Sequence, residues 1–326
     1  MRIAVKNKPP RAPRRDARKK YLFWGAGLPH LCALGVLGGK IFLAGVITFL
    51  SVGSLHSQEY VSCYLNGQLG NQMFQIAAAL SFALDHGCEA RFPNIAQARD
   101  APINAPYILH RLNQESFPPD VQFEAYHDRI HSNIYAPIPY EKGKNLCIYG
   151  HYESEKYFLP HAPLIRELFA PTPEILAEIR AKYGHLLQNP TVAVHVRTFI
   201  PDHRDPRFKG IGGSGWGYFT QAMNLFPPNT HFLVFSDAMQ WTKLRFPRSA
   251  RKVTFIEDNP AHIDFYLMML CDHQIISPES TFSWWAAWLN PNPHKKVIIA
   301  DTWNDLTEND TIPDGWIKLK KTDWHF

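Results

Sequence analysis

The stretch S-P-E-S-T-F-S-W-W-A-A-W-L, residues 277–289, joins a hydroxyl-rich turn to a segment too aromatic for a solvent-facing helix. An apolar strand is expected just before it, at residues 274–277. Ser280, Thr281 and Ser283 stand where the helix should begin, and the first N–H groups of a helix lack internal partners and carry the positive end of its dipole. A phosphate fits such a site. The alternative is that Ser280 or Thr281 only caps the helix while the tryptophans fill a core.

Two further apolar segments end in polar side chains. Residues 191–196, T-V-A-V-H-V, read as a buried strand that carries His195 and delivers Arg197 at its carboxyl end. Residues 231–235, H-F-L-V-F, read as another strand, and it delivers Asp237. Ligands of parallel sheets bind beyond the carboxyl ends of the strands. These side chains are therefore predicted to converge on one crevice with the hydroxyl-rich turn.

Helical segments separate the predicted strands. Residues 259–271 begin with a capping Asn259, continue with Pro260 at the first helical position, and place apolar residues at helical spacing. One more short apolar strand is expected at residues 297–300. Strands that alternate with helices predict an α/β protein with a parallel sheet and right-handed crossovers.

The amino-terminal half repeats this pattern around a different loop. A strand is expected at residues 60–65, an apolar helix at residues 73–85 and a second strand at residues 89–92. Between the first strand and the helix lies N-G-Q-L-G-N-Q, residues 66–72. This is the start of a βαβ unit, but its loop is neither G-x-G-x-x-G nor a P-loop, so the usual dinucleotide and ATP readings fail on spacing.

The glycine loop is itself a candidate site. Gly67 and Gly70 let the backbone approach a ligand, and Asn71 and Gln72 add side-chain donors at the start of the helix. The alternative is a plain tight turn. By contrast, the region from 101 to 139 is rich in Pro, Asn and His and predicts only loops and short elements.

The first 58 residues form a basic and apolar leader. The first twenty contain nine Arg or Lys and one Asp, a charge of +8, so the rest of the chain carries −3 of the net +5. The basic isoelectric point thus belongs to the leader, and the remainder gives no support for nucleic-acid binding. Residues 21–39 are uncharged and just long enough to span a bilayer. A signal peptide, a peripheral anchor and a later start of translation stay open.

Four motifs occur in order along the chain. They are L-N-G-Q-L-G-N-Q-M-F-Q at residues 65–75, H-V-R at 195–197, F-S-D at 235–237, and S-T-F-S-W-W-A-A-W-L at 280–289. This set resembles that of glycosyltransferase family 11, the α-1,2-fucosyltransferases that use GDP-fucose. The resemblance covers residues 60–303.

The resemblance implies a GT-B-like fold, in which two Rossmann-like domains face each other across a cleft. We therefore expect an acceptor-side domain at residues 59–173 and a nucleotide-sugar domain at residues 174–326, behind the leader at residues 1–58. About 270 residues after the leader are ample for two such domains. The partners implied are a GDP-sugar donor and a galactoside-terminated glycan acceptor, with membrane association at the cytoplasmic face in a bacterium or as a type II Golgi protein in a eukaryote.

The implied reaction is fucosyl transfer with inversion, during which negative charge grows on the leaving diphosphate. Arg197 and the helix that starts near Thr281 are the expected stabilisers of that charge. His195 is expected to position the phosphate or the fucose, or else to be a core histidine capped by a backbone carbonyl. Asp237 is expected to accept from the guanine edge, or else to cap the next helix.

The chain departs from the family pattern in three places. After H-V-R it has Thr198 and Phe199, and it reaches Asp202, Arg204 and Asp205 only later. Ala238 replaces a second Asp, and Glu279 replaces an Asn, so Glu279 is expected to point away from a phosphate or to contact the acceptor. A different nucleotide-sugar transferase and a non-catalytic, membrane-tethered carbohydrate-binding protein therefore remain as alternatives.

No metal or other cofactor is expected. The chain has no D-x-D pair, by which many sugar-nucleotide enzymes hold a metal on the diphosphate, and its five cysteines show neither zinc-site spacing nor a disulfide framework. Without a metal, the diphosphate needs Arg and helix-terminal N–H groups instead.

Overall fold

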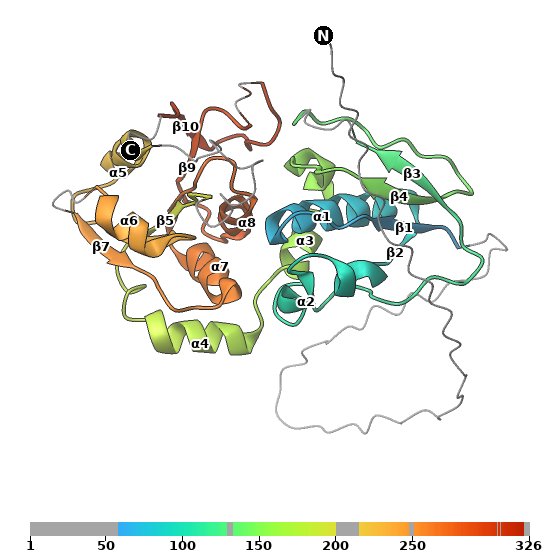
Figure 1. Cartoon of the computed structure of the whole chain (residues 1–326), viewed down its shortest axis with the longest axis horizontal. Coiled ribbons are helices and arrows are strands. Elements are labelled where there is room, and N and C mark those ends of the chain that lie inside the picture. Colours follow the sequence, from blue (N-terminus) through green and yellow to red (C-terminus); the bar gives the residue numbers. More distant parts are fainter. Residues whose placement is uncertain are drawn as a thin grey trace, which may run out of the picture. The chain divides into compact units, whose positions relative to one another are not determined.

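Figure 1 shows the computed structural model of the chain. It describes residues 58–128, 133–199, 215–247, 251–304, 306 and 308–322. Residues 1–57 of the leader lie outside this part of the chain, as do Asp202, Arg204 and Asp205. No helix among the described residues combines the length and the apolar composition that a membrane crossing requires.

The first sheet has four parallel strands in the order β2-β1-β4-β3. Its strands are β1 (Tyr60–Cys63), β2 (Glu89–Ala90), β3 (Phe123–His127) and β4 (Asn145–Tyr149). The connecting helices are α1 (Leu69–His86), η1 (Pro93–Gln97) and α2 (Ala101–Asn104). The sequence did not predict β3, because this edge strand is half exposed and lacks both an apolar run and regular alternation.

The second sheet has six parallel strands in the order β10-β9-β8-β5-β6-β7. Its strands are β5 (Thr191–Val196), β6 (His231–Ser236), β7 (Lys252–Phe255), β8 (His273–Ile275), β9 (Val297–Ala300) and β10 (Ile317–Leu319). The chain starts in the middle with β5, builds outward to β7, then returns to add β8, β9 and β10 on the other side. This is the order of a doubly wound Rossmann sheet, and it reverses between β5 and β8.

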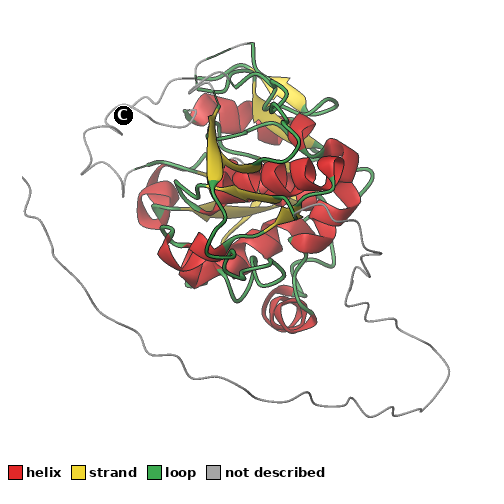
Figure 2. Cartoon of the chain, turned by 90° about the vertical axis from the view of Figure 1, so that its right-hand side faces the viewer, coloured by secondary structure: helices red, strands yellow, loops and turns green. Residues whose placement is uncertain are grey.

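Helices pack around both sheets (Figure 2). After β4 come η2 (Glu155–Tyr157), η3 (Leu159–His161), α3 (Ala162–Leu168) and α4 (Pro173–Tyr183), and α4 is seen end-on at the bottom of Figure 2. The second sheet carries α5 (Trp216–Asn224), α6 (Met239–Arg245), α7 (Ala261–Leu270) and α8 (Thr281–Leu289). All strands of the first sheet precede α4 in the sequence, and all strands of the second sheet follow it. Two successive parallel sheets with their helices confirm the predicted GT-B-like α/β fold.

Two helix starts differ from the prediction. Helix α1 begins at Leu69, so Gly70, Asn71 and Gln72 lie in its first turn and not in the loop before it. The left-handed residue of this loop is Gly67, with φ of 72°. Helix α7 begins one residue later than expected, with Pro260 as its cap.

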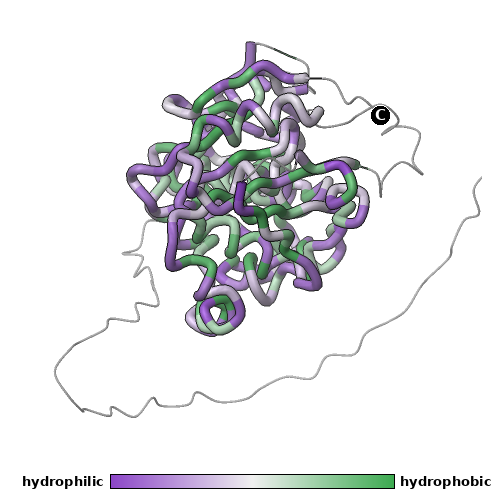
Figure 3. Tube along the Cα trace, turned by 90° about the vertical axis from the view of Figure 1, so that its left-hand side faces the viewer, coloured by the Kyte–Doolittle hydropathy of each residue, from purple (hydrophilic) through white to green (hydrophobic). Residues whose placement is uncertain are grey.

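Helices α1 and α8 meet where the two halves join (Figure 1). The Trp284 and Trp285 rings pack on Phe74 of α1, with centroids 4.5 and 4.9 Å apart, inside the larger apolar core. Trp285 Nε1 also donates to the Gly70 carbonyl at 3.0 Å. Along the described chain, hydrophobic segments run mainly through the interior and hydrophilic ones over the outer turns (Figure 3).

Gly70 permits this helix contact because it has no side chain. A Cβ atom there would lie 2.5 Å from the carbonyl carbon and Oγ1 of Thr281 and 2.7 Å from the Phe282 nitrogen. Those distances are far below van der Waals contact, and two of these atoms belong to backbone that cannot rotate aside.

We predict that Gly70→Ala lowers the free energy of unfolding by about 1–3 kcal/mol, because the methyl group must push α8 away from α1. Gly70→Ser and Gly70→Val should lower the free energy of unfolding progressively more, since the steric clash with α8 grows with the size of the side chain. Urea unfolding of the series checks this. A series whose stability does not change with size would contradict the close approach.

Candidate active site

A cavity of about 930 Å³ lies beyond the carboxyl ends of the strands of both sheets. Strands β1 and β4 are followed by lining segments that include Gly67, Asn71, His151 and Glu153. The second sheet contributes the polar residues that follow β5, β6 and β8, namely Arg197, Asp237, Glu279, Ser280 and Thr281. The reversal point between β5 and β8 is where doubly wound sheets bind ligands. The predicted convergence of these three loops is thus present.

Backbone strain is concentrated around this cavity. Seven non-glycine residues of the described chain have positive φ, and six of them line the cavity: Asp100, Asn133, Tyr152, Phe199, Glu279 and Asn304. Such conformations each cost about 1–3 kcal/mol and persist where the surrounding structure imposes them, which is typical of ligand sites. The strain therefore marks the cavity as a functional site without reference to any motif.

Asp237 organises the end of β5. Its carboxylate forms an ion pair with Arg197, and it accepts hydrogen bonds from the Thr198 and Phe199 amides at 2.8 and 3.0 Å. The cap position of α6 is Ala238, without a side-chain hydrogen bond, so Asp237 does not cap that helix. The carboxylate proposed from sequence for the guanine edge is thus engaged within the protein, where it fixes Arg197.

Arg197 faces the cavity from this network. Its backbone amide donates to Ser277 Oγ at 3.1 Å, which ties the end of β5 to the segment after β8. Its Nη2 donates to Gln68 Oε1 at 3.3 Å, so the guanidinium reaches from the second sheet to the loop after β1. A planar guanidinium held at one edge by a carboxylate can bind an anion with its other edge.

His195 lies on the inner wall of the cavity and is 7% exposed. Its Nδ1 lies 3.2 Å from Ser280 Oγ, so its partner is a hydroxyl group and not the backbone carbonyl of the core-histidine alternative. Burial lowers the pKa of His195 to about 4, a shift that Asp237 opposes and Arg197 assists. The imidazole is therefore neutral at physiological pH and can position a ligand by hydrogen bonding.

The amino-terminal end of α8 opens into the cavity as predicted. Ser280 caps the helix by accepting from the Ser283 amide at 3.4 Å, and Thr281 and Phe282 line the cavity. Ser283 is 1% exposed and donates to the Ser280 carbonyl, so it supports the turn and lies outside the large cavity. Ser280 therefore caps the helix, but its cap satisfies only one of the first amides. The described residues offer no acceptor for the Thr281 and Phe282 amides, so these can still bind an anion.

Two cations hold the opposite end of the same helix. Arg166 donates to the Trp288 carbonyl, and Lys295 donates to the Asn290 carbonyl at 2.7 Å. Burial lowers the pKa of Lys295 to about 8. Positive charge at the carboxyl end of α8 complements its dipole, while the positive amino-terminal end is left for an anion in the cavity.

The glycine loop contributes two polar side chains to the cavity, Gln68 and Asn71. Asn71 accepts from Thr281 Oγ1 at 2.7 Å and lies 3.2 Å from His151 Nδ1, so it joins both halves of the site. Gln72 is fully buried and donates to the Gly67 and Arg99 carbonyls. It shapes the loop but does not line the cavity, because the first turn of α1 rotates it toward the core.

The comparisons with known proteins agree with this geometry. The sequence profile described as glycosyl transferase family 11 matches residues 40–320. The chain belongs to glycosyltransferase family 11. The resemblance inferred from the motifs is therefore confirmed.

Several proteins named as sugar transferases are similar to this chain. The α-1,2-colitosyltransferase of Escherichia coli is 25% identical over 300 residues, which cover 79% of this chain and 98% of the relative. Human galactoside α-(1,2)-fucosyltransferase 1 is 28% identical over 247 residues, covering 69% of this chain and 64% of the relative. The solved structure of NodZ α-1,6-fucosyltransferase soaked with GDP-fucose superposes with a TM-score of 0.48 at 17% identity, over 77% of this chain and 98% of that chain.

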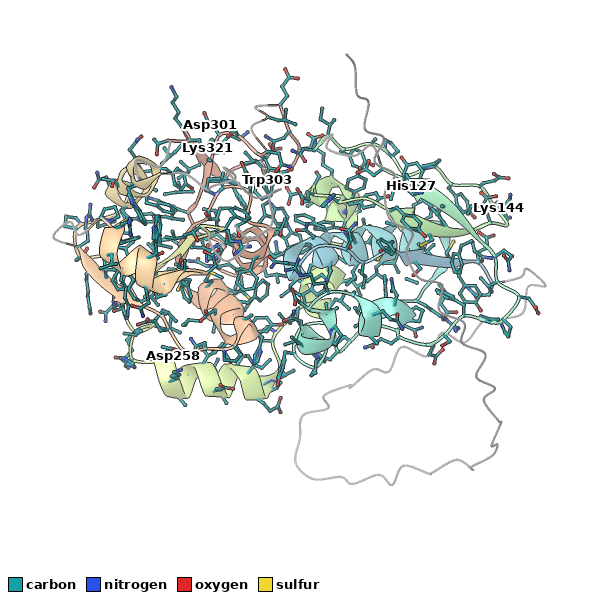
Figure 4. The ribbon with its side chains drawn as sticks, viewed as in Figure 1. His127, Lys144, Asp258, Asp301, Trp303 and Lys321 are labelled. Carbon is teal, nitrogen blue, oxygen red and sulfur yellow. The ribbon has the colours of Figure 1, made fainter. Side chains whose placement is uncertain are left out.

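Several cavity residues of this family member were not predicted. Asp264 lines the cavity from α7 and accepts from Asn259 Nδ2 at 2.8 Å. The sequence feature that could have indicated it is a single carboxylate within the apolar run A-H-I-D-F-Y-L-M-M-L. Glu279, which was expected to point away from a phosphate or to contact the acceptor, lines the cavity and pairs there with Lys321 at 2.8 Å, a partner that was not predicted. Lys321 follows β10 and is labelled beside Asp301 in Figure 4; no local pattern indicated it.

We predict that Arg197→Ala lowers kcat at least tenfold, about 1.4 kcal/mol, because water cannot replace a charge-assisted contact to a leaving phosphate. Arg197→Lys should restore little, since a point charge replaces a planar fork. Asp237 keeps its bonds to Thr198 and Phe199, so the variant should fold. Arg180→Ala on the exposed face of α4 is the control. Steady-state kinetics would contradict the assignment if Arg197→Ala kept more than a tenth of wild-type activity.

Proposed function

We propose that the chain transfers fucose, or the related sugar colitose, from its GDP conjugate to a hydroxyl group of a galactoside-terminated glycan, with inversion at the transferred carbon. The observation that carries the proposal is the convergence of the family 11 motifs on one cavity, with Arg197 and the start of α8 on one wall and Asn71 on the other. Fucosyl transfer is favoured by the human relative, and colitosyl transfer by the bacterial relative, of which the match covers 98%.

The diphosphate would bind between Arg197 and the amino-terminal end of α8. A phosphate oxygen can take the place of Gln68 Oε1 on Arg197 Nη2, while Asp237 keeps the guanidinium in position. The amides of Thr281 and Phe282 would donate hydrogen bonds to the phosphate oxygen that gains negative charge as the sugar C1–O bond breaks. These donors are fixed before the reaction, so they stabilise the leaving group without reorganisation.

The guanine base would be read by Asp264. A carboxylate can accept from N1–H and the 2-amino group of guanine together, and Asp264 is the cavity carboxylate on α7, where it accepts from the Asn259 side-chain amide. This replaces Asp237, whose oxygens serve Arg197 and the 198–199 backbone. Burial raises the pKa of Asp264 to about 6, so the carboxylate that would bind guanine forms only above that pH.

We further propose that the reaction needs no divalent metal. The described residues contain no group of three or more His, Cys, Asp or Glu side chains placed to hold a metal ion. Cavity carboxylates Asp237 and Glu279 are paired with Arg197 and Lys321, respectively. Activity after exhaustive chelation tests this point, and complete loss that Mg²⁺ or Mn²⁺ restores would contradict it.

The deciding experiment is a screen for GDP release. The full chain would be incubated with GDP-fucose, GDP-colitose, GDP-mannose or UDP-galactose, each with and without lactose. Colitose is fucose without its 3-hydroxyl, so the ratio of the first two rates reports whether the site binds that hydroxyl. Release only from GDP-fucose or GDP-colitose, and faster with lactose, supports the proposal. Release from UDP-galactose alone favours a different transferase, and binding without release favours a carbohydrate-binding protein.

We predict that GDP affinity falls as pH drops below about 6, because protonated Asp264 cannot accept from guanine. Asp264→Asn should weaken GDP binding at least tenfold at pH 7.5 and bind GDP and inosine diphosphate, which lacks the 2-amino group, about equally. Isothermal titration at pH 5.5 and 7.5 provides the measurement. The phosphates of GDP also titrate near pH 6, but their effect on affinity is the same for both proteins and cancels in the ratio of wild-type to variant affinity. An unchanged preference for GDP in the variant would exclude Asp264 as the reader.

A second prediction concerns the leader, for which membrane association remains our proposal. Deleting residues 1–57 should leave a folded chain that binds GDP with wild-type affinity, because every cavity residue and strand of the described fold lies beyond Gln58. Calorimetric titration and analytical ultracentrifugation of the shortened chain check this. Aggregation of the shortened chain would instead indicate that the apolar leader packs on the core.

A further inference from the structure

The cavity wall opposite Arg197 contains a histidine and a carboxylate that the binding scheme does not use. His151 and Glu153 follow β4, and both line the cavity. His151 Nδ1 lies 3.5 Å from Glu153 Oε1, and Glu153 Oε2 accepts from Trp303 Nε1 at 2.8 Å. Trp303 is labelled near the centre of Figure 4. The imidazole is thus held at one nitrogen by a carboxylate that is itself held by an indole.

The backbone aims both side chains at the cavity. Tyr152, between them, is 1% exposed and has φ of 52°, so its ring enters the core while its two neighbours face outward. Gln75 Nε2 donates to the Gly150 carbonyl at 3.0 Å, and Ser154 Oγ donates to the Asp310 carbonyl at 2.8 Å. Both ends of this strained segment are therefore fixed, which is typical of a functional position.

The pair also lies close to the proposed phosphate site. His151 Nδ1 is 3.2 Å from the Asn71 amide group, which in turn bonds to Thr281 at the first turn of α8. Asn71 Oδ1 accepts from Thr281 Oγ1, so the amide nitrogen is the end that faces Nδ1, and a proton on Nδ1 is accepted by Glu153 Oε1 at 3.5 Å. Nε2 then carries the lone pair, and no described side chain bonds to it. The His151 side chain is 43% exposed, so a hydroxyl group can reach it.

We propose that His151, oriented by Glu153, is the general base that activates the acceptor hydroxyl. This inference rests on the proposed function. The acceptor O–H bond breaks and its proton goes to His151 Nε2, while the oxygen forms the new bond to the sugar C1. The C1–O bond to the β-phosphate breaks at the same time, and its electron pair leaves with GDP. The imidazolium, stabilised by Glu153, later releases the proton to water.

The other acidic groups of the cavity are less suited to this role. Asp237 and Glu279 are paired with cations, and Asp264 lies on α7 with Asn259. Asp100 lies 3.6 Å from Arg99. The pKa of His151 is raised mainly by Glu153 and lowered by partial burial. The charge of Asp128, which follows β3, also raises it.

The test combines single variants with pH profiles of kcat. His151→Gln should lower kcat about 10²- to 10⁴-fold, leave GDP affinity unchanged, and remove the decline of the wild-type rate at acid pH. Glu153→Gln should lower kcat less and move that decline to lower pH, because the hydrogen bond that His151 donates to Glu153 is the main cause that raises the pKa of His151. A role in structure alone would change melting temperature without moving the profile.

His161→Gln is the matched control, since His161 also pairs with a carboxylate, Asp85 at 2.7 Å, but lies outside the cavity lining. Its kcat and profile should equal those of wild type. The inference is overturned if His151→Gln keeps more than a tenth of wild-type kcat, or if Asp128→Asn and not His151→Gln removes the acid decline. If His151→Gln fails to fold, the pH profile of Glu153→Gln is the deciding measurement: a decline moved to lower pH supports the inference, and an unmoved decline overturns it. A wild-type chain that binds GDP but transfers no sugar overturns the proposed function itself and the base with it.

Discussion

The contact between Gly70 of α1 and the Thr281–Phe282 backbone of α8 is the constraint on which the rest of the site depends. No side chain larger than hydrogen fits at position 70, so the first turns of two helices from different halves of the chain approach backbone to backbone. This contact lets Asn71 bond to Thr281 and lets Trp285 donate to the Gly70 carbonyl. The walls of the cavity are thereby fixed relative to each other at the point where an anion would bind.

The charges of the site are arranged around helix α8. Its carboxyl end is covered by Arg166 and Lys295, whereas its amino-terminal end has one serine cap and otherwise opens into the cavity. Arg197 stands beside that end with its charge directed by Asp237. On the opposite wall, His151 and Glu153 can remove a proton. A leaving group that gains negative charge and an acceptor that loses a proton are thus served from opposite sides.

Local sequence patterns predicted the inner strands of both sheets only in part, and the helices α1, α7 and α8. Apolar runs identified β1, β5, β6, β8 and β9 within two residues, and the serine cap identified the start of α8. They missed β7 and β10 as well as β3, whose edge position leaves it half exposed, and they misplaced the start of α1, where Gly70 has the pattern of a turn residue although it lies inside a helix. Glycine there serves close packing, and a single sequence does not distinguish that use from a positive φ.

The sequence by itself determined the α/β class, the family and the strand ends that carry Arg197, His195 and Thr281, because alternating periodicities and ordered motifs are local properties. Only the tertiary structure decided the partners of those residues. Asp237 reaches Arg197 across 40 residues, and Asn71 reaches Thr281 across 210. It likewise turned Gln72 into the core, brought Asp264 into the cavity and placed Glu153 between His151 and Trp303. Such meetings depend on strand order and helix packing, which no short stretch of sequence encodes.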